Sequence, residues 1–504
     1  MRTAIIGGGI AGLAAAYELE KARAAGAPVE YTLFEARERL GGSIATEIVN
    51  DAILERGPDS FISEKPAAAE LCRELGLAAD LTPSNDAERK TYVVVRNRLI
   101  PLPDGLMFLV PTKLVPTALT GLFSLKTKIR MGLELLHPPR PSGQDESVAA
   151  LVERHFGAEA VDRLADPLLS GIFGGDATQL SARTVLPRLV EMEEKYGSLT
   201  RGMLAAHRQM RAKMTAANKN PSPVGQGADR TTRAVGTGAA APERRGPRGI
   251  FTTLRGGMQQ LVDTLEERLD AQALRLNTKV DAVEKTADGW RLTLGGVVEE
   301  FDAVIMASPA WAVSALLKNV DSELAEDLAG IPYSSSITAN LVYDEAQIGE
   351  LPEGFGFLVP ASEKRTLLAC TFVHRKFLGR TPTGKAVLRA FLGGAKNEEL
   401  LATTDADLIA VVRRELSEIL GERIIPRDAP VEFAQITKWR RAMAQYSVGH
   451  QERIARVNER VAALPGLRLA GNAYDGIGIP DCIRLGRQAA RERVGETQPV
   501  AANS

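Results

Sequence analysis

The chain has 504 residues, of which 44% are hydrophobic, 5% aromatic and 25% charged, and its formal net charge is −1 at pH 7. This length exceeds one ordinary domain, and the composition is that of a soluble globular protein. The near-zero charge and the low aromatic content give no reason to expect nucleic-acid binding.

Cysteine and histidine are too sparse for a disulfide framework or a metal site. Cys72, Cys370 and Cys482 follow no C-x-x-C pattern, and the five histidines form no H-x-x-x-H pair. An apolar strand begins at residue 3, which leaves no room for a signal peptide, and no run of about 18 apolar residues predicts a membrane-spanning helix. We therefore expect a cytoplasmic protein with reduced thiols and no metal.

The chain opens on a dinucleotide-binding pattern, because an apolar strand leads into the G-G-G-I-A-G of residues 7–12 and then into a predicted helix. Gly7 permits the tight turn, Gly9 lets the backbone approach a pyrophosphate, and Gly12 lets helix and strand pack closely. The pyrophosphate would lie at the helix N-terminus. The next strand ends at Glu35, about 20 residues further on, where a carboxylate can accept hydrogen bonds from a ribose.

Residues 37–42 read R-E-R-L-G-G and resemble the R-x-G-G signature of flavin-dependent amine oxidases and their relatives. In that family the two glycines let the chain pass close to the phosphates of the flavin cofactor. Ser43 stands where the family usually has Arg, which argues against an amine oxidase but not against FAD. We therefore predict FAD as the cofactor.

The middle of the chain changes character twice. Residues 91–102 predict a strand with a turn at Arg96 and Asn97, and residues 99–210 are mainly helical. Residues 216–249 contain no aromatic residue, Leu or Ile, and have six basic residues against two acidic ones. Such a segment buries too little apolar surface to fold, so we predict a disordered insertion over residues 212–249.

Strands return after residue 250, at residues 274–283, 290–301 and 301–309, and residues 310–435 alternate strands and helices. The last part, from residue 462, contains a strand, a Gly-rich loop and a terminal helix near Asp481 whose positive dipole end would face the flavin. The predicted fold class is α/β, with a Rossmann-type FAD-binding domain assembled from discontinuous segments, a mixed-sheet substrate domain and a helical insertion that contacts membrane. The predicted boundaries are 1–65, 250–310 and 436–495 for the FAD domain; 66–98 and 311–435 for the substrate domain; 99–211 for the helical domain; and 496–504 for a tail.

Four motifs resemble the porphyrinogen oxidases of haem biosynthesis. Residues 439–450 read W-R-R-A-M-A-Q-Y-S-V-G-H, close to that family's W-x-x-x-x-P-Q-Y-x-x-G-H, with Ala444 in place of Pro. The other three are the Gly-rich segment 471–483, the glycine turn 57–61, and residues 167–176, which read P-L-L-S-G-I-F-G-G-D. The resemblance covers essentially the whole chain apart from residues 212–249.

This resemblance implies a six-electron oxidation of a porphyrinogen to the porphyrin, with O2 as acceptor and H2O2 as by-product. No protein nucleophile or metal is needed, because the flavin N5 accepts hydride and the protein supplies orientation and a dry slot. The implied partners are the porphyrinogen and O2. Ferrochelatase is a candidate for receiving the product, and a homodimer stays an open alternative.

The resemblance also carries over site residues by position. Gly175 lies where a backbone carbonyl faces the pyrrole N–H groups, and Leu358 and Phe391 match apolar residues that flank the ring. Arg96 matches a basic residue that can bind a propionate through a bidentate guanidinium, and Lys65 would serve further carboxylates. The cofactor-binding residues are Gly7, Gly9, Ile10, Ala11, Gly12, Glu35, Arg39, Gly41, Gly42, Ser43, Gly57, Pro58, Asp59, Ser60, Val280, Trp439, Gly471, Gly478 and Ile479.

Several alternatives stay open. Leu358, Phe391 and Trp439 are also typical core residues, and Arg96 and Lys65 are typical exposed ones. The substrate is coproporphyrinogen III, favoured by resemblance to the Gram-positive bacterial branch in residues 110–114, 120–125, 369–371 and 478–482, or protoporphyrinogen IX. An amine oxidase is the distant alternative. The apolar and basic residues of 106–130 suit either peripheral contact with the inner face of the cell membrane or the wall of a substrate channel.

Overall fold

The computed structural model describes residues 1–107, 109–139, 143–219 and 249–497. Most of the predicted disordered insertion, residues 220–248, and most of the predicted tail, residues 498–504, lie outside the described residues. Helix α10 runs over Leu199–Lys219, and helix α17 over Ile479–Thr497. A helix therefore continues across each of the predicted boundaries at residues 211 and 495.

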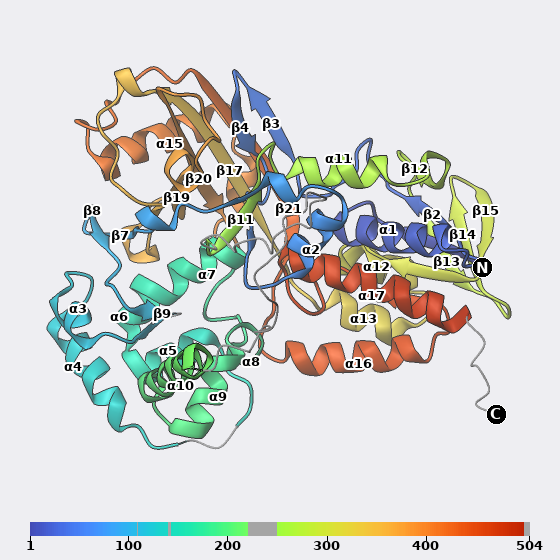
Figure 1. Cartoon of the computed structure of the whole chain (residues 1–504), viewed down its shortest axis with the longest axis horizontal. Helices are drawn as coiled ribbons and strands as arrows, with labels where there is room; N and C mark the ends of the chain where they lie inside the picture. Colours follow the sequence, from blue (N-terminus) through green and yellow to red (C-terminus); the bar gives the residue numbers. More distant parts are fainter. Residues whose placement is uncertain (108, 140–142, 220–248, 498–504) are drawn as a thin grey trace, which may run out of the picture.

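A five-stranded parallel sheet forms the centre of one half of the molecule (Figure 1). Its strand order is β12 (Leu274–Arg275), β2 (Glu30–Phe34), β1 (Arg2–Ile6), β16 (Ala303–Met306), β22 (Leu467–Leu469). Parallel neighbours need long crossover connections. That requirement explains why segments separated by hundreds of residues meet in one sheet, and it confirms the predicted Rossmann-type fold.

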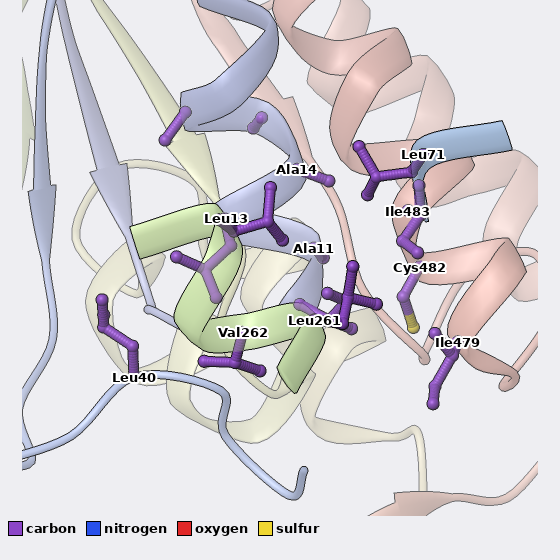
Figure 2. Packing of buried hydrophobic residues seen from close by; sticks show 14 of the residues in the cluster. Ala11, Leu13, Ala14, Leu40, Leu71, Leu261, Val262, Ile479, Cys482 and Ile483 are labelled. Carbon is purple, nitrogen blue, oxygen red and sulfur yellow. The ribbon is translucent and has the colours of Figure 1, made fainter. Parts of the chain in front are cut away.

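Helices cover both faces of this sheet. On one face α1 (Ile10–Ala24) packs against α17 and α11 (Gln259–Glu267), and Figure 2 shows Leu13, Ile483 and Leu261 from these three helices in one core. The helix backbones approach closely, since a Cβ atom at Gly486 would lie 2.1 Å from Ala11 O. The other face is covered by α12 (Ala310–Leu317), α13 (Ser322–Ala329) and α16 (His450–Ala462).

Two predictions about this half were wrong. Residues 290–301 form a hairpin of β14 (Trp290–Leu294) and β15 (Val297–Phe301), because Gly295 and Gly296 adopt φ values of 57° and 88° that turn the chain. Residues 274–283 also form no continuous strand, since β12 ends at Arg275 and β13 covers Ala282–Lys285.

A seven-stranded mixed sheet forms the second half. Its order is β21 (Phe433–Ala444), β17 (Tyr333–Asp344), β20 (Lys385–Gly393), β19 (Ala369–Phe372), β18 (Gly356–Leu358), β7 (Thr91–Val95), β8 (Arg98–Pro101). All neighbours are antiparallel except β18 and β7. Helix α15 (Asp405–Leu420) covers one face over a buried apolar core, so the predicted mixed sheet is confirmed.

The structure divides the segment 66–98 between the two halves. Helix α2 (Ala67–Glu74) packs into the core of α1 and α17, and β6 (Leu81–Pro83) pairs with β11 (Phe251–Leu254), which also pairs with β5 (Phe61–Ile62). Only β7 and β8 of this segment join the seven-stranded sheet. Helix α2 lies here because its apolar side chains, Ala68, Leu71 and Cys72, are buried in the core with α1 and α17 rather than against the seven-stranded sheet.

The three cysteines are free and buried. Cys72 and Cys482 lie in the core between α2 and α17 (Figure 2 labels Cys482), and Cys370 lies in the core under α15. Burial raises the pKa of Cys72 and of Cys482 to about 12 and also raises that of Cys370.

The described residues between β8 and β11 in the chain are mainly helical. Their core is formed by α4 (Leu125–Leu133), α5 (Val148–Phe156), α7 (Asp166–Phe173), α9 (Pro187–Tyr196) and the first turn of α10. None of the helices formed by the described residues is long and apolar enough to cross a membrane.

A buried polar network holds these helices together. His155 on α5 lies between two carboxylates, with Nδ1 2.9 Å from Glu134 Oε1 and Nε2 3.1 Å from Glu193 Oε1. Glu134 also accepts hydrogen bonds from Ser198 Oγ at 2.8 Å and from the Leu199 amide at 2.6 Å. Burial favours the neutral imidazole, but the two carboxylates outweigh it and raise the pKa of His155.

Replacing His155 by Ala should lower the free energy of unfolding by about 3 kcal/mol, because two buried carboxylates lose their shared partner. Since the folded pKa is raised above 6.5, the stabilisation is complete below that pH and is lost as the pH rises through the folded pKa. The difference between wild type and variant, measured by chemical denaturation, should therefore shrink at alkaline pH. The exposed His207 on α10 is the control, and an equal effect of His207→Ala or a difference that grows with pH would contradict this role.

Candidate functional site

The turn between β1 and α1 requires two of its glycines for its own geometry. Gly7 has φ 114°, and a Cβ atom there would lie 2.8 Å from Ala307 O. A Cβ atom at Gly12 would lie 1.9 Å from Gly7 O, so the helix can start here only without a side chain. Both residues have the roles that the sequence predicted for a tight turn and for close packing.

Gly9 is different, because no contact among the described residues requires it to be glycine. Its φ of −70° suits any residue, and a Cβ atom there would meet no atom of the described residues within 4 Å. It precedes the first turn of α1, whose amide groups have no partner within the helix, and no side chain caps them. This open cradle at a helix N-terminus fits a pyrophosphate.

The loop after β2 lies beside this cradle. Gly41 forms a bridge with Gly9 and donates from its amide to Gly8 O at 2.8 Å. The loop is held by Arg39, whose guanidinium donates to the carbonyls of residues 40, 42 and 44 at 3.0, 2.5 and 2.9 Å. Burial, followed by the nearby Arg37, lowers the pKa of Arg39. Arg39 therefore shapes the loop through its own hydrogen bonds.

Glu35 lies at the end of β2, as predicted. Its carboxylate accepts hydrogen bonds from the amides of Gly8 at 2.7 Å and Arg37 at 2.9 Å. It therefore joins the first glycine turn to the second strand. Val280, predicted to bind the cofactor, is buried in the core on the other face of the sheet, with 6% of its surface exposed.

The residues that flank the C-terminal Gly-rich loop, Ala470 and Ile479, share a core with Ile10 and Ala11 at the start of α1. Asp481 in the first turn of α17 accepts a hydrogen bond from the Gly478 amide at 3.2 Å and pairs with Lys65 Nζ at 2.7 Å. Tyr446 Oη donates to Asn472 O at 2.9 Å. The structure thus places Lys65 beside the predicted cofactor loop, with its charge already paired.

The glycine turn at residues 57–60 packs against the loop of residues 41–43. A Cβ atom at Gly57 would lie 1.7 Å from Ser43 O. Asp59 accepts hydrogen bonds from Ser60 Oγ at 2.7 Å and Lys376 Nζ at 2.9 Å, and Arg389 Nη1 lies 3.5 Å away. Burial would raise the pKa of Asp59, but the charges of Lys376 and Arg389 outweigh it and hold that pKa well below its usual value.

Leu358 and Phe391 lie on one face of the seven-stranded sheet. Both pair in register with Ala369 on β19, the strand between them. The residues next to them on these strands, whose side chains point to the opposite face, pack under α15. Leu358 and Phe391 are themselves half-buried, and a Cβ atom at Gly171 on α7 would lie 3.7 Å from Leu358 Cδ2. The structure therefore brings these two predicted substrate residues together next to α7.

Gly175 follows α7 at the border of this face. The Gly174 carbonyl accepts a hydrogen bond from the Ala395 amide at 3.0 Å, and Gly175 O accepts one from Ser170 Oγ at 3.1 Å. Gln445, which belongs to the motif of residues 439–450, donates from Nε2 to Phe173 O at 2.7 Å and so holds the end of α7.

Arg96 lies apart from this group. It occupies the exposed turn between β7 and β8 with φ 51°, and its amide donates to Glu363 Oε1 at 2.6 Å. Leu358 on β18 pairs with Val93 on β7, which precedes that turn in the chain. The predicted turn is confirmed, whereas binding of a propionate by Arg96 stays a prediction.

Sequence reasoning missed the charged residues behind the glycine turn. Arg389, Arg380 and Glu55 are all less than 5% exposed, and Arg380 Nη1 pairs with Glu55 Oε1 at 2.6 Å. The signal was present in the sequence, because Arg389 interrupts the apolar run of residues 386–392. Arginine in such a strand is rarely buried without a partner.

Comparison with known proteins gives a consistent result. The family described as flavin containing amine oxidoreductase matches residues 10–492. Coproporphyrinogen III oxidase of Bacillus subtilis is 34% identical over 97% of this chain and 97% of that protein. The chloroplastic protoporphyrinogen oxidase of Nicotiana tabacum is 29% identical over 97% of this chain and 85% of that protein. The crystal structure of a putative protoporphyrinogen oxidase from Exiguobacterium sp. 255-15 superposes with a TM-score of 0.81 at 31% identity, covering 98% of this chain and 99% of that one.

Replacing Gly9 by Ala should leave the stability of the flavin-free protein unchanged, because the new Cβ meets no atom in the described part of the chain, yet weaken flavin binding by at least about tenfold. Flavin content after purification and a titration followed by flavin fluorescence measure this. The matched control is Gly132→Ala on α4, where a Cβ also meets nothing. Normal flavin affinity in Gly9→Ala would show that the pyrophosphate lies elsewhere.

Proposed function

Because the chain belongs to the family of flavin-containing amine oxidoreductases, we propose that it is an FAD-dependent oxidase that converts a porphyrinogen to the corresponding porphyrin. The observation that carries this proposal is the arrangement of the mixed sheet. Leu358 and Phe391 share a face whose neighbouring strands also hold the glycine turn of residues 57–60. A macrocycle whose apolar ring rests on this face would lie next to the loops that are predicted to bind the cofactor.

FAD is proposed over a smaller flavin because the cofactor-binding features form an extended series. The open cradle at Gly9 suits a pyrophosphate, and Glu35 is predicted to bind a ribose. The turn of residues 57–60 packs on Ser43, and Ala470 and Ile479, which flank the loop of residues 471–478, share a core with Ile10. When bound, the flavin supplies the hydride acceptor, which no protein side chain can replace. The protein's own residues bind, orient and shield the two reactants.

Coproporphyrinogen III is the proposed substrate, with protoporphyrinogen IX as the alternative. Support comes from the relative in Bacillus subtilis, which bears the name coproporphyrinogen III oxidase and matches nearly the whole chain. O2 is the proposed acceptor. Product transfer to ferrochelatase and formation of a homodimer stay predictions.

Purified yellow protein in air should produce porphyrin fluorescence faster from coproporphyrinogen III than from protoporphyrinogen IX. The same assay without protein gives the rate of spontaneous oxidation and serves as the control. Preference for protoporphyrinogen IX would overturn the assignment of substrate. Activity on neither, in protein with bound flavin, would overturn the proposed function and favour amine oxidation.

We also propose that the helical segment contacts a membrane surface. Six apolar side chains of α3 (Leu114–Leu119), α4 and the following turn are between 55% and 80% exposed, and we call them the α3–α4 patch: Val115, Leu119, Leu125, Ile129, Leu133 and Leu136. Exposed Lys113 and Lys126 lie in the same stretch. Exposed apolar residues beside lysines suit an interface with anionic lipids better than the wall of a closed channel.

The double variant Leu119→Glu, Leu125→Glu should reduce co-sedimentation with vesicles of phosphatidylglycerol by about tenfold, because two apolar contacts are lost and negative charge is added. Leu378→Glu is the matched control, since Leu378 is 65% exposed outside the helical segment. Failure of the wild-type protein to bind these vesicles at low salt would refute membrane contact.

A further inference from the structure

Successive carbonyl groups of the turn that precedes Pro58 are bonded to side chains of one sheet. Asn340 Nδ2 donates to Glu55 O at 3.0 Å, and Thr338 Oγ1 donates to Arg56 O at 2.7 Å. Asn340 and Thr338 are two residues apart on β17 and therefore lie on the same face. Both are almost fully buried, with 1% and 4% of their surfaces exposed.

The neighbouring strands complete this set of donors. The Arg389 guanidinium on β20 donates to Gly57 O, and Trp439 Nε1 on β21 donates to Arg56 O at 2.7 Å. The Glu55–Gly57 backbone is thus held by four side chains from three adjacent strands, β20, β17 and β21. The turn cannot shift relative to the sheet without leaving buried polar groups unpaired, which is costly.

The same face carries the proposed substrate contacts. In the ladder between β17 and β20, Asn340 pairs with Arg389 and Thr338 pairs with Phe391. The Arg389 guanidinium also lies 4.8 Å from the centroid of the Phe391 ring. Phe391 and the donors to the turn are therefore fixed to each other by direct cross-strand neighbours.

On the cofactor side the turn has equally little freedom. Gly57 packs so closely on Ser43 that a Cβ atom would lie 1.7 Å from Ser43 O. A movement of the turn would therefore move the loop of residues 41–43, which borders the open cradle at Gly9.

We propose that Thr338, Asn340 and Arg389 are positioning residues that set the separation between a macrocycle resting on Phe391 and a flavin resting on the turn. The inference rests on the proposed function and adds to it a device that fixes the two reactants in one frame. Small errors in such a separation are expensive for catalysis, because reaction requires close and aligned reactants.

Thr338→Val tests the proposal, because it keeps the shape of the side chain and removes the hydroxyl that donates to Arg56 O. We expect kcat to fall about tenfold with little change in KM, since the substrate face stays intact while the two reactants lose alignment. We also expect a shifted visible flavin spectrum and an FAD dissociation constant raised about tenfold. Thr338→Ser should restore all three quantities, because it keeps the donor.

The matched control is Thr264→Val, which removes a hydroxyl that donates to Gln260 O at 2.8 Å within α11. It should lower stability without moving the flavin spectrum. Asn340→Leu is a second test on a different carbonyl and should give the same signature as Thr338→Val. A flavin spectrum and FAD affinity unchanged in both Thr338→Val and Asn340→Leu would overturn the proposal.

The spectrum and the FAD affinity need no porphyrinogen, so this result is separable from failure of the proposed function. Wild-type protein that binds FAD but oxidises neither porphyrinogen would overturn the function alone. If Thr338→Val or Asn340→Leu fails to fold, the other variant still tests the proposal, because each removes a different hydrogen bond.

Discussion

The half that is built on the five-stranded parallel sheet depends on backbone-to-backbone contact between α1 and α17, the first and last helices of the described chain. Gly12 lets α1 begin directly against the strand that precedes it, and Gly486 lets α17 touch Ala11 O. Only residues without a Cβ permit this approach, and the small alanines of α1 extend it (Figure 2). Because the two helices lie in contact, Ala470 and Ile479, which flank the loop of residues 471–478, share one core with the first turn of α1.

Attachment of the two halves to each other rests on buried polar groups. Arg389, Lys376 and Asp59 form an ion-pair cluster in the interface, and Arg380 with Glu55 forms another. Such groups contribute less to net stability than apolar packing of the same volume, but they tolerate only one arrangement. Apolar packing holds each half together, and a small apolar cluster that contains Leu54, Val342 and Val387 also joins the halves, whereas these charges fix how the halves meet.

The sequence predicted those features whose physical cause is local. The turn at residues 7–12, the strand that leads to Glu35 and the turn at Arg96 and Asn97 follow from residue type and spacing. Local patterns failed where tertiary contacts decide, as for Lys65, whose partner Asp481 is distant in sequence, and Arg389, whose acceptors lie on another segment. The hairpin at residues 290–301 was missed although its cause is local, because Gly295 and Gly296 divide a run that otherwise resembles one strand.

The buried cysteines have a consequence for the proposed oxidase, which would release peroxide with O2 as the acceptor. Peroxide attacks the thiolate rather than the thiol, and damage begins with conversion of the thiolate to sulfenic acid. Burial raises the pKa of Cys482, a few residues from the Gly-rich loop, to about 12, so almost none of it is thiolate at neutral pH. Cys72 and Cys370 are protected in the same way. The fold thereby keeps the three thiols protonated and slow to react with the peroxide that the proposed reaction would release.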